Sequence, residues 1–593
     1  EASAGRWSEG LEIGRLITLE DFPRPRFEDF GGESATSITK TAEEHILFKE
    51  VTDEVGIEFV FQDGADQSTA ETLLFEFTGG GVAAWDYDKD GWSDLYFVQG
   101  GQPPQWGSNN SLDAASQPLD KLYRNLGNGR FSDTGHIAEV ADSIYGQGVT
   151  VGDYNSDGFP DLYVASIGQN ILYENNGDGT LTEVVVPSFA ENQTWTTSVV
   201  LADLNHDGLA DIYDVTYVTK SGVHSKMCKS GEASIPCFVE QKLEPEQDRF
   251  FLNLGDGRFR EATAESGFIA KEGIGLGVVA ADFNSSGQLE LFVANDARAN
   301  FLFVNQDKTA EAPRFTNEAL IRGLAYNSAG RLQACMGVAV DDANQDGLLD
   351  LFVTNFYADD NTYYQQTSEM FFDDRTVAAG LHSISYNMLG FGTQFIDIEL
   401  DGNPDLVITN GDVVDFTEVE KSREYRQRPQ CLLNQGQRRF QELHDIGDYF
   451  QKKQIGRGLV KLDWNRDGRE EFAVSHLGTS AALLKNETKT SNHSVDIRLV
   501  ARDSHRDAIG TSVTVTAGKE SWTKQLTAGD GYLASNQRHL LFGLGTHSGK
   551  IELSVNWSSG AQQTFQISEV DKTFLLVEGL GNAFTLPDAE EHP

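Results

Sequence analysis

The chain has 593 residues, of which 39% are hydrophobic and 59 are glycine, and its net charge at pH 7 is −45. This charge would repel the phosphates of nucleic acids and of anionic membranes, so neither is expected as a partner. No apolar run approaches the ~18–20 residues of a membrane-spanning helix. Frequent glycines between short apolar runs favour an all-β protein rich in tight turns.

The first 46 residues are polar and without a clear period. We expect an extended arm over residues 1–46 with one short helix near Thr36–His45. The chain begins at Glu1 without the apolar core of a signal peptide, which favours a processed, mature form. The run Phe48–Thr52 then reads as the first strand.

An acidic loop between two apolar runs follows at Gly81–Val98. It places four carboxylates within nine residues, where their repulsion would be costly without a cation. Oxygen ligands at alternate positions, with Gly91 at the sharp turn, are what Ca²⁺ requires. This stretch therefore predicts a calcium hairpin.

The same unit occurs seven times in all, which is the sequence signature of a repeat architecture. In each loop, positions 1, 3, 5 and 9 offer side-chain ligands, and position 7 offers a backbone carbonyl. Loop by loop, the predicted ligands are Asp86, Asp88, Asp90, Trp92 and Asp94; Asp153, Asn155, Asp157, Phe159 and Asp161; Asp203, Asn205, Asp207, Leu209 and Asp211; Asp282, Asn284, Ser286 and Glu290; Asp342, Asn344, Asp346, Leu348 and Asp350; Asp397, Glu399, Asp401, Asn403 and Asp405; and Asp463, Asn465, Asp467, Arg469 and Glu471. The fourth loop has only two carboxylates, so we expect six strong calcium sites and one weak or empty site.

An EF-hand is the rival interpretation of these loops. It would need a bidentate acid at position 12 and a helix on each side. Six of the seven residues at that position are apolar and continue a strand, and the seventh is Asp214. We therefore reject the EF-hand, and the remaining alternative is an Asp- and Gly-rich turn without metal.

Each unit supplies about four short strands. A glycine stands five residues before the first Asp of every loop except the third, where Ser198 takes its place. Hairpin turns such as Gly127-Asn-Gly129 and Gly255-Asp-Gly257 follow. Four-stranded repeats predict an all-β, seven-bladed β-propeller over residues 47–486. The seventh unit lacks its fourth strand, and we expect Phe48–Thr52 to supply it and to close the ring.

Two insertions interrupt the period. Asp214–Asp248 contains Cys228 and Cys237, which could form a disulfide in an oxidising compartment, with free thiols as the alternative. Gly411–Gln430 contains a charged segment, Glu418–Arg428, for which we predict a helix.

Beyond residue 486 the period stops and alternating strands predict a separate β domain over residues 487–575. The predicted strands are Asp496–Val500, Ser512–Thr516, Trp522–Leu526, His539–Gly543, Ile551–Trp557 and Gln563–Val570. We expect residues 576–593 to form a disordered, polar tail.

The loop pattern resembles the FG-GAP/VCBS repeat, which builds the propeller of integrin α subunits. The stretches Arg506–Gly510, Ala528–Leu533, Leu541–Gly545 and Val555–Gly560 resemble the ASPIC/UnbV domain. Together they are similar to the cartilage acidic protein family. The resemblance implies a secreted, calcium-binding protein, extracellular or periplasmic, that serves in adhesion or as a scaffold. It implies no known reaction.

The sequence offers little sign of catalysis, since it contains no HExxH, GxSxG, P-loop or Rossmann pattern. Tyr386, Asn387 and Asp412 stand near expected blade ends, where propeller ligands often bind. The leading hypothesis is a binding or scaffold protein for an unidentified protein or glycan. The alternatives are an enzyme acting on a carbohydrate or phosphoester at a propeller face, and a subunit of a surface assembly joined through its C-terminal domain.

Overall fold

The computed structural model describes residues 46–65, 72–101, 117–190, 194–223, 228–230, 233–235, 243–306, 313–417, 420–436 and 439–587. The helix expected near Thr36–His45 lies outside these residues. So does Cys237, and with it the predicted disulfide to Cys228. Cys335 and Cys431 are buried free thiols. None of the helices in the described ranges has the length and hydropathy of a membrane span.

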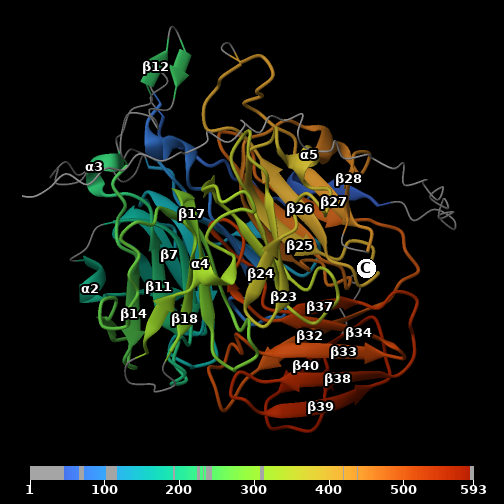
Figure 1. Cartoon of the computed structure of the whole chain (residues 1–593). Coiled ribbons are helices and arrows are strands. Elements are labelled where there is room, and N and C mark those ends of the chain that lie inside the picture. The colour runs from blue at the N-terminus through green and yellow to red at the C-terminus, as the bar shows by residue number, and fades with distance from the viewer. Residues whose placement is uncertain are drawn as a thin grey trace, which may run out of the picture. The chain divides into compact units, whose positions relative to one another are not determined.

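Strands dominate the chain, and most of them form consecutive four-stranded antiparallel units (Figure 1). The units are β2–β5 (Val82–Trp85, Asp94–Phe97, Lys121–Asn125, Phe131–Asp133); β6–β9 (Gly146–Gly152, Asp161–Gly168, Ile171–Asn175, Leu181–Val184); β10, β11, β14 and β15 (Thr194–Ala202, Asp211–Thr216, Arg249–Asn253, Phe259–Glu261); β16–β19 (Gly275–Ala281, Glu290–Arg298, Phe301–Asn305, Phe315–Asn317); β21–β24 (Val338–Asp341, Asp350–Val353, Thr362–Ser368, Phe371–Asp374); β25–β28 (Gly390–Ile396, Asp405–Asn410, Gln430–Asn434, Phe440–Leu443); and β29–β31 (Gly456–Leu462, Glu471–His476, Ala482–Asn486) with β1 (Phe48–Glu50).

The first strand of each unit contacts the first strand of the next unit, and β29 of the last unit contacts β2 of the first. These inner strands therefore close a ring, and the predicted all-β, propeller-like fold is confirmed. β1 pairs antiparallel with β31, with Phe48 opposite Asn486, which is the place predicted for the closing strand. β7 and β10 also pair, so the second and third units share one sheet.

Short elements connect these strands. They are α1 (Thr52–Val55), η2 (Leu74–Phe77), α2 (Pro187–Ala190), α3 (Lys220–Val223), α4 (Ala319–Arg322), α5 (His382–Ser385), η5 (Asp448–Gln451), the hairpin β12–β13 (Cys228–Ser230, Ala233–Ile235) and β20 (Gln333–Ala334).

The repeated glycine before each loop is explained by how closely the inner strands approach. A Cβ at this glycine would lie 2.1–2.5 Å from a carbonyl oxygen on the next inner strand or up to two residues before it, in every unit that has the glycine. The six are Gly81, Gly148, Gly277, Gly337, Gly392 and Gly458. In the third unit, the Ser198 hydroxyl donates instead to Leu276 O at 2.6 Å. Glycine therefore permits the close approach of neighbouring backbones.

The predicted helix over Glu418–Arg428 is wrong, because its described residues 420–428 contain a turn, a bend and an isolated bridge but no helix. Arg423 explains this conformation. Its guanidinium lies over the rings of Phe356, Tyr357 and Phe416, 4.0–5.2 Å from their centroids, and pairs with the buried Asp412. Packing against distant aromatic rings thus overrides local helix propensity.

The C-terminal residues form two four-stranded sheets, coloured orange to red in Figure 1. They contain β32 (Ser494–Val500), β37 (Leu540–Gly543), β40 (Lys572–Val577) and β41 (Phe584–Thr585) in one sheet, and β33 (Ser512–Ala517), β34 (Glu520–Gln525), β38 (Ile551–Asn556) and β39 (Gln562–Ile567) in the other. The prediction of a disordered tail is therefore wrong for residues 576–585, which include strand residues of β40 and β41. Phe574 and Leu576 alternate into the core and hold β40 in place.

This region is also not the fully separate domain that the sequence predicted. Residues 528–535, with the short strands β35 (Ala528–Gly529) and β36 (Ala534–Ser535), enter the centre of the ring, and we call them the central plug. β35 pairs with β16, and β36 pairs in parallel with β2. At its tip, Gly531 exchanges backbone hydrogen bonds with Val338, and Tyr532 is fully buried against Phe391.

Candidate functional site

The seven acidic loops share one backbone conformation. In each loop, residue 4 and the glycine at residue 6 are left-handed, with φ of 55–64° and 78–97° respectively. The first Asp accepts a hydrogen bond from the N–H of that glycine, at 2.7–3.1 Å in all seven. The fourth loop, with its two carboxylates, follows the same path, so the turn does not depend on the number of acids.

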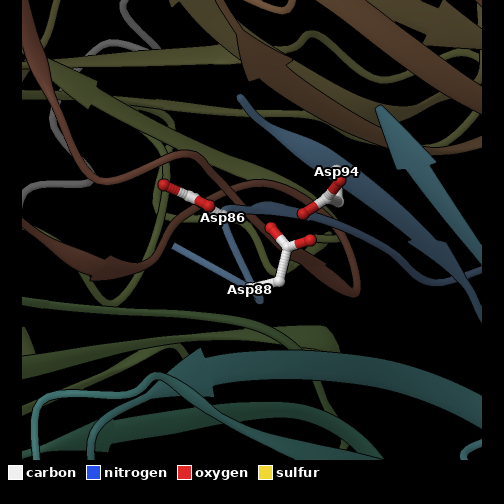
Figure 2. Close-up of side chains that lie close together, drawn as sticks. All are labelled: Asp86, Asp88 and Asp94. Carbon is white, nitrogen blue, oxygen red and sulfur yellow. The ribbon is translucent and has the colours of Figure 1, made fainter. Parts of the chain in front are cut away.

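The first loop brings three predicted ligands together. One carboxylate oxygen from each of Asp86, Asp88 and Asp94 lies within 4.8 Å of the others (Figure 2). Among the described residues, this is the one group of three His, Cys, Asp or Glu side chains that meets this criterion. Asp90, the fourth predicted acid, pairs with Arg124 at 3.0 Å, and Arg124 also contacts Asp88. The arginine thus supplies part of the positive charge that this loop requires.

Buried carboxylates of the loops have raised pKa values. Burial raises the pKa of Asp161 to about 9 and that of Asp342 to about 7. Burial, followed by repulsion from Asp90, raises the pKa of Asp86 to about 6. A bound cation would favour the ionised forms and offset this cost.

Unpartnered buried oxygens give a second reason to place a cation here. Asp86 Oδ1, Asn344 Oδ1 and Glu471 Oε2 are buried ligand atoms without a hydrogen-bond partner. A buried polar atom without a partner carries a desolvation cost, and metal coordination removes it. Hard oxygen donors of this kind fit Ca²⁺.

The acid at position 9 also has a structural role, which the sequence did not indicate. Asp161 illustrates it: its two oxygens accept the N–H groups of Tyr154 in its own loop, at 2.9 Å, and of Asn175 on the third strand, at 2.8 Å. The acids of the first, third and sixth loops make the equivalent pair of bonds. Position 9 therefore braces the loop against its own sheet.

The same third-strand residue reaches the neighbouring unit. In all seven units its side-chain amide donates to the carbonyl of the second residue of the preceding loop, at 2.7–3.5 Å. The donor and acceptor pairs are Asn125 and Trp464, Asn175 and Tyr87, Asn253 and Tyr154, Asn305 and Leu204, Gln366 and Phe283, Asn434 and Ala343, and Asn486 and Ile398. We call these bonds the amide ring. The pair Asn125 and Trp464 closes it between the first and last units.

The amide ring links each loop to the next, so one side chain should matter far beyond its own turn. Asn175 is 1% exposed and makes two further hydrogen bonds, to Pro160 O and from Gly177 N. We expect Asn175→Ala to lower the free energy of unfolding by about 2–4 kcal/mol, because it leaves buried backbone groups unsatisfied. Denaturant unfolding measures this loss.

The adjacent Asn176 provides a matched control, since its side chain is exposed and its hydrogen bonds within the described part of the chain are to Thr180 and Thr182 of its own hairpin. We expect Asn176→Ala to change stability by no more than about 0.5 kcal/mol. Equal losses for the two variants would contradict a bracing role for the amide ring.

C-terminal residues lie directly on the acidic loops. His505 Nε2 is 2.7 Å from Asp153 O in the second loop. Gln525 exchanges two hydrogen bonds with the backbone of Asp282 in the fourth loop, at 2.7 and 3.0 Å. Asn492 donates to Glu399 O in the sixth loop. The C-terminal sheets therefore cover the end of the ring that carries the predicted metal ligands.

A cavity of about 840 Å³ lies at the opposite end of the inner strands. Ile274 and Leu276, at the start of β16, line it, whereas Asp282 follows the other end of that strand. Of the residues that the sequence placed near blade ends, Asp412 is ion-paired with Arg423, and Tyr386 O accepts a hydrogen bond from Ala358 N in the cavity wall.

Comparison with protein families agrees with the repeats and the C-terminal sheets. Residues 86–164 and 153–213 match the FG-GAP-like repeat, and residues 501–583 match the ASPIC and UnbV family. The chain therefore contains FG-GAP-like repeats within residues 86–213 and an ASPIC/UnbV domain within residues 501–583.

The chain is 25% identical over 325 residues to cartilage acidic protein 1 of Homo sapiens, covering 54% of this chain and 46% of that protein. It is 23% identical over 340 residues to the Mus musculus protein, covering 56% and 49%. The chain thus spans about half the length of the curated relatives it matches.

Solved structures show weaker likeness. An Agrocybe aegerita lectin that recognises terminal N-acetylglucosamine aligns with a TM-score of 0.37 and 15% identity, covering 63% of this chain and 88% of the lectin. YCF48 bound to a D1 peptide aligns with a TM-score of 0.36 and 8% identity, covering 75% and 98%.

Proposed function

We propose that this protein is a calcium-stabilised, extracellular binding or scaffold protein. The observation that carries the proposal is the set of seven loops with a single conformation, each with buried oxygen ligands that a cation would stabilise. Calcium would neutralise the loops and fix them between the sheets and the C-terminal domain. Sites of moderate affinity fill where calcium is millimolar, which supports an extracellular location.

Metal analysis of the purified protein tests the proposal. At equilibrium dialysis against calcium at millimolar concentration, we expect about six more calcium ions per chain than the dialysate accounts for, because six loops have three or four carboxylates. A double variant, Asp342→Asn with Asp346→Asn, should lose one ion. Asp256→Asn, at an exposed hairpin turn outside the loops, should lose none. Fewer than three ions in the unmodified protein would overturn the proposal.

A further inference from the structure

The cavity at the end of the ring opposite the acidic loops has a floor built from several units. Phe77, Leu276, Met336 and Phe391 contribute to it from the first, fourth, fifth and sixth units. The same apolar cluster contains Tyr532 of the central plug, so the plug lies against this floor. A pocket of about 840 Å³ is in the range that encloses a small organic molecule.

The side-chain hydroxyl groups that line the cavity are already bonded within the protein. Tyr217 donates its hydroxyl to Asp296 Oδ2 at 2.6 Å, and Thr78 donates to Phe75 O at 3.1 Å. Tyr357 donates to Glu420 at 3.0 Å. A ligand with many hydroxyls would therefore lose its hydrogen bonds to water without replacement. The interior of the cavity therefore favours a ligand whose surface is apolar.

The lining of the cavity also includes two acids and two arginines: Asp296, Asp359, Arg298 and Arg331. The guanidinium of Arg298 donates to Ala297 O at 3.0 Å, and that of Arg331 lies 4.0 Å from Asp359. Within the described ranges, neither guanidinium has a carboxylate within hydrogen-bond distance. Both can accept an anionic group, and the two acids can accept a cationic one.

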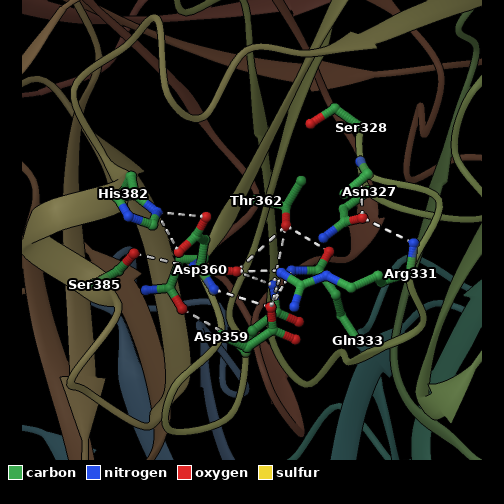
Figure 3. Close-up of polar contacts among 12 residues, drawn as sticks. Asn327, Ser328, Arg331, Gln333, Asp359, Asp360, Thr362, His382 and Ser385 are labelled. Atoms are coloured by element: carbon green, nitrogen blue, oxygen red, sulfur yellow. Dashed lines mark hydrogen bonds and ion pairs between the residues drawn. The ribbon is translucent and has the colours of Figure 1, made fainter. Parts of the chain in front are cut away.

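Hydrogen bonds fix the position of one of these acids, Asp359. Gln333 donates to Asp359 at 3.1 Å, and Thr362 donates to Gln333. His382 lies 2.8 Å from Asp360, so the turn that carries Asp359 and Asp360 is fixed (Figure 3). Ala297 and Ala358, which line the cavity, have φ of 52° and 62°. Left-handed residues other than glycine persist only where their surroundings enforce them, and they are concentrated at functional sites.

We propose that this cavity binds a short apolar peptide with free termini, whose side chains fill the cavity while Arg298 and Arg331 hold its carboxylate and Asp296 and Asp359 its ammonium group. The proposal names a ligand for the binding role proposed above and does not require the calcium sites. A net-neutral ligand also avoids the long-range repulsion that a chain of charge −45 exerts on anions.

Isothermal titration of the calcium-loaded protein with the tripeptide Leu-Phe-Leu tests this proposal. We expect saturable binding, weakened about 10- to 100-fold when both termini of the peptide are blocked, because charge-assisted hydrogen bonds are lost. Arg298→Gln should weaken binding of the free peptide to a similar extent. Arg258→Gln, an exposed arginine in an outer hairpin, is the matched control and should leave binding unchanged.

A second variant, Ala334→Trp, fills the cavity from β20 and should abolish binding while Tm stays within a few degrees. The proposal is overturned if the folded protein does not bind the peptide, if blocked and free peptides bind equally, or if a trimer of N-acetylglucosamine binds in its place and is blocked by Ala334→Trp. Calcium content is measured on the same sample. Peptide binding without calcium would contradict only the calcium proposal, and calcium without peptide binding would contradict only this one.

Discussion

Chelation of calcium with EGTA is expected to lower the Tm of this protein by at least about 10 °C. A ligand at a hundred times its Kd stabilises the folded state by about 2.7 kcal/mol per site, and six such sites together exceed the ~5–15 kcal/mol that holds a typical domain folded. Each calcium ion removed also leaves two negative charges uncompensated on a chain of net charge −45. Differential scanning calorimetry measures the change.

The control for chelation is EGTA saturated with an excess of calcium, which should leave Tm unchanged. Magnesium at the same concentration should restore little, because it demands a smaller, stricter octahedral site. A Tm that is insensitive to EGTA would mean that the loops are metal-free turns.

The pH dependence of the chelated protein has a definite sign. In the absence of the cation, burial raises the pKa of Asp161 to about 9 and those of Asp342 and Asp463 to about 7. The folded state then binds more protons than the unfolded state, whose Asp residues titrate near 3.9. The associated stability is present at low pH and is lost as pH rises through about 7 to 9. The Tm difference between calcium-loaded and chelated protein should therefore widen from pH 5 to pH 9.

Removal of the Tyr532 side chain from the central plug should destabilise the protein more than the other single substitutions described above. Tyr532 is fully buried, its ring centroid lies 5.0 Å from that of Phe391, and it belongs to a cluster with residues from at least five units. We expect Tyr532→Ala to reduce the free energy of unfolding by about 3–5 kcal/mol, as for other large buried aromatic side chains. Denaturant unfolding in calcium gives this value.

Two controls define what the loss means. Tyr532→Phe keeps the ring and should retain most of the stability, whereas Tyr326→Ala removes a partly exposed tyrosine and should cost under about 1 kcal/mol. If Tyr532→Ala behaves like Tyr326→Ala, the plug does not stabilise the ring.

The sequence predicted what local chemistry determines. Alternating acids with Gly91 indicated a tight loop, and the recurrence of Gly337 and its equivalents marked the inner strands. The asparagines at the third-strand ends were visible in the repeats, but their acceptors, such as Tyr87 O for Asn175, lie in another unit. No periodicity within one unit shows a contact of that kind.

The sequence did not predict the central plug, strand β40 or the conformation of residues 420–428, and the reason is the same for all three. Gly531 and Tyr532 are hydrogen-bonded or packed against strands 140 to 200 residues earlier in the chain, and Arg423 is held by Phe356 and Tyr357. Phe574 and Leu576 did alternate, yet the burial that makes them a strand depends on pairing with β32. Long-range packing decided each of these cases.

The pairing of β1 with β31 has a consequence for how the protein is made. Phe48 is synthesised early, but its partner Asn486 follows more than four hundred residues later. At ~5–20 residues per second, a ribosome needs roughly 20–90 s to cover that interval. During this time the N-terminal strand and the apolar edge of the first unit stay without their partners, and Tyr532 has still to arrive. The ring can close only after translation of this region is complete, and until then its unpaired strand edges are exposed to association with other chains.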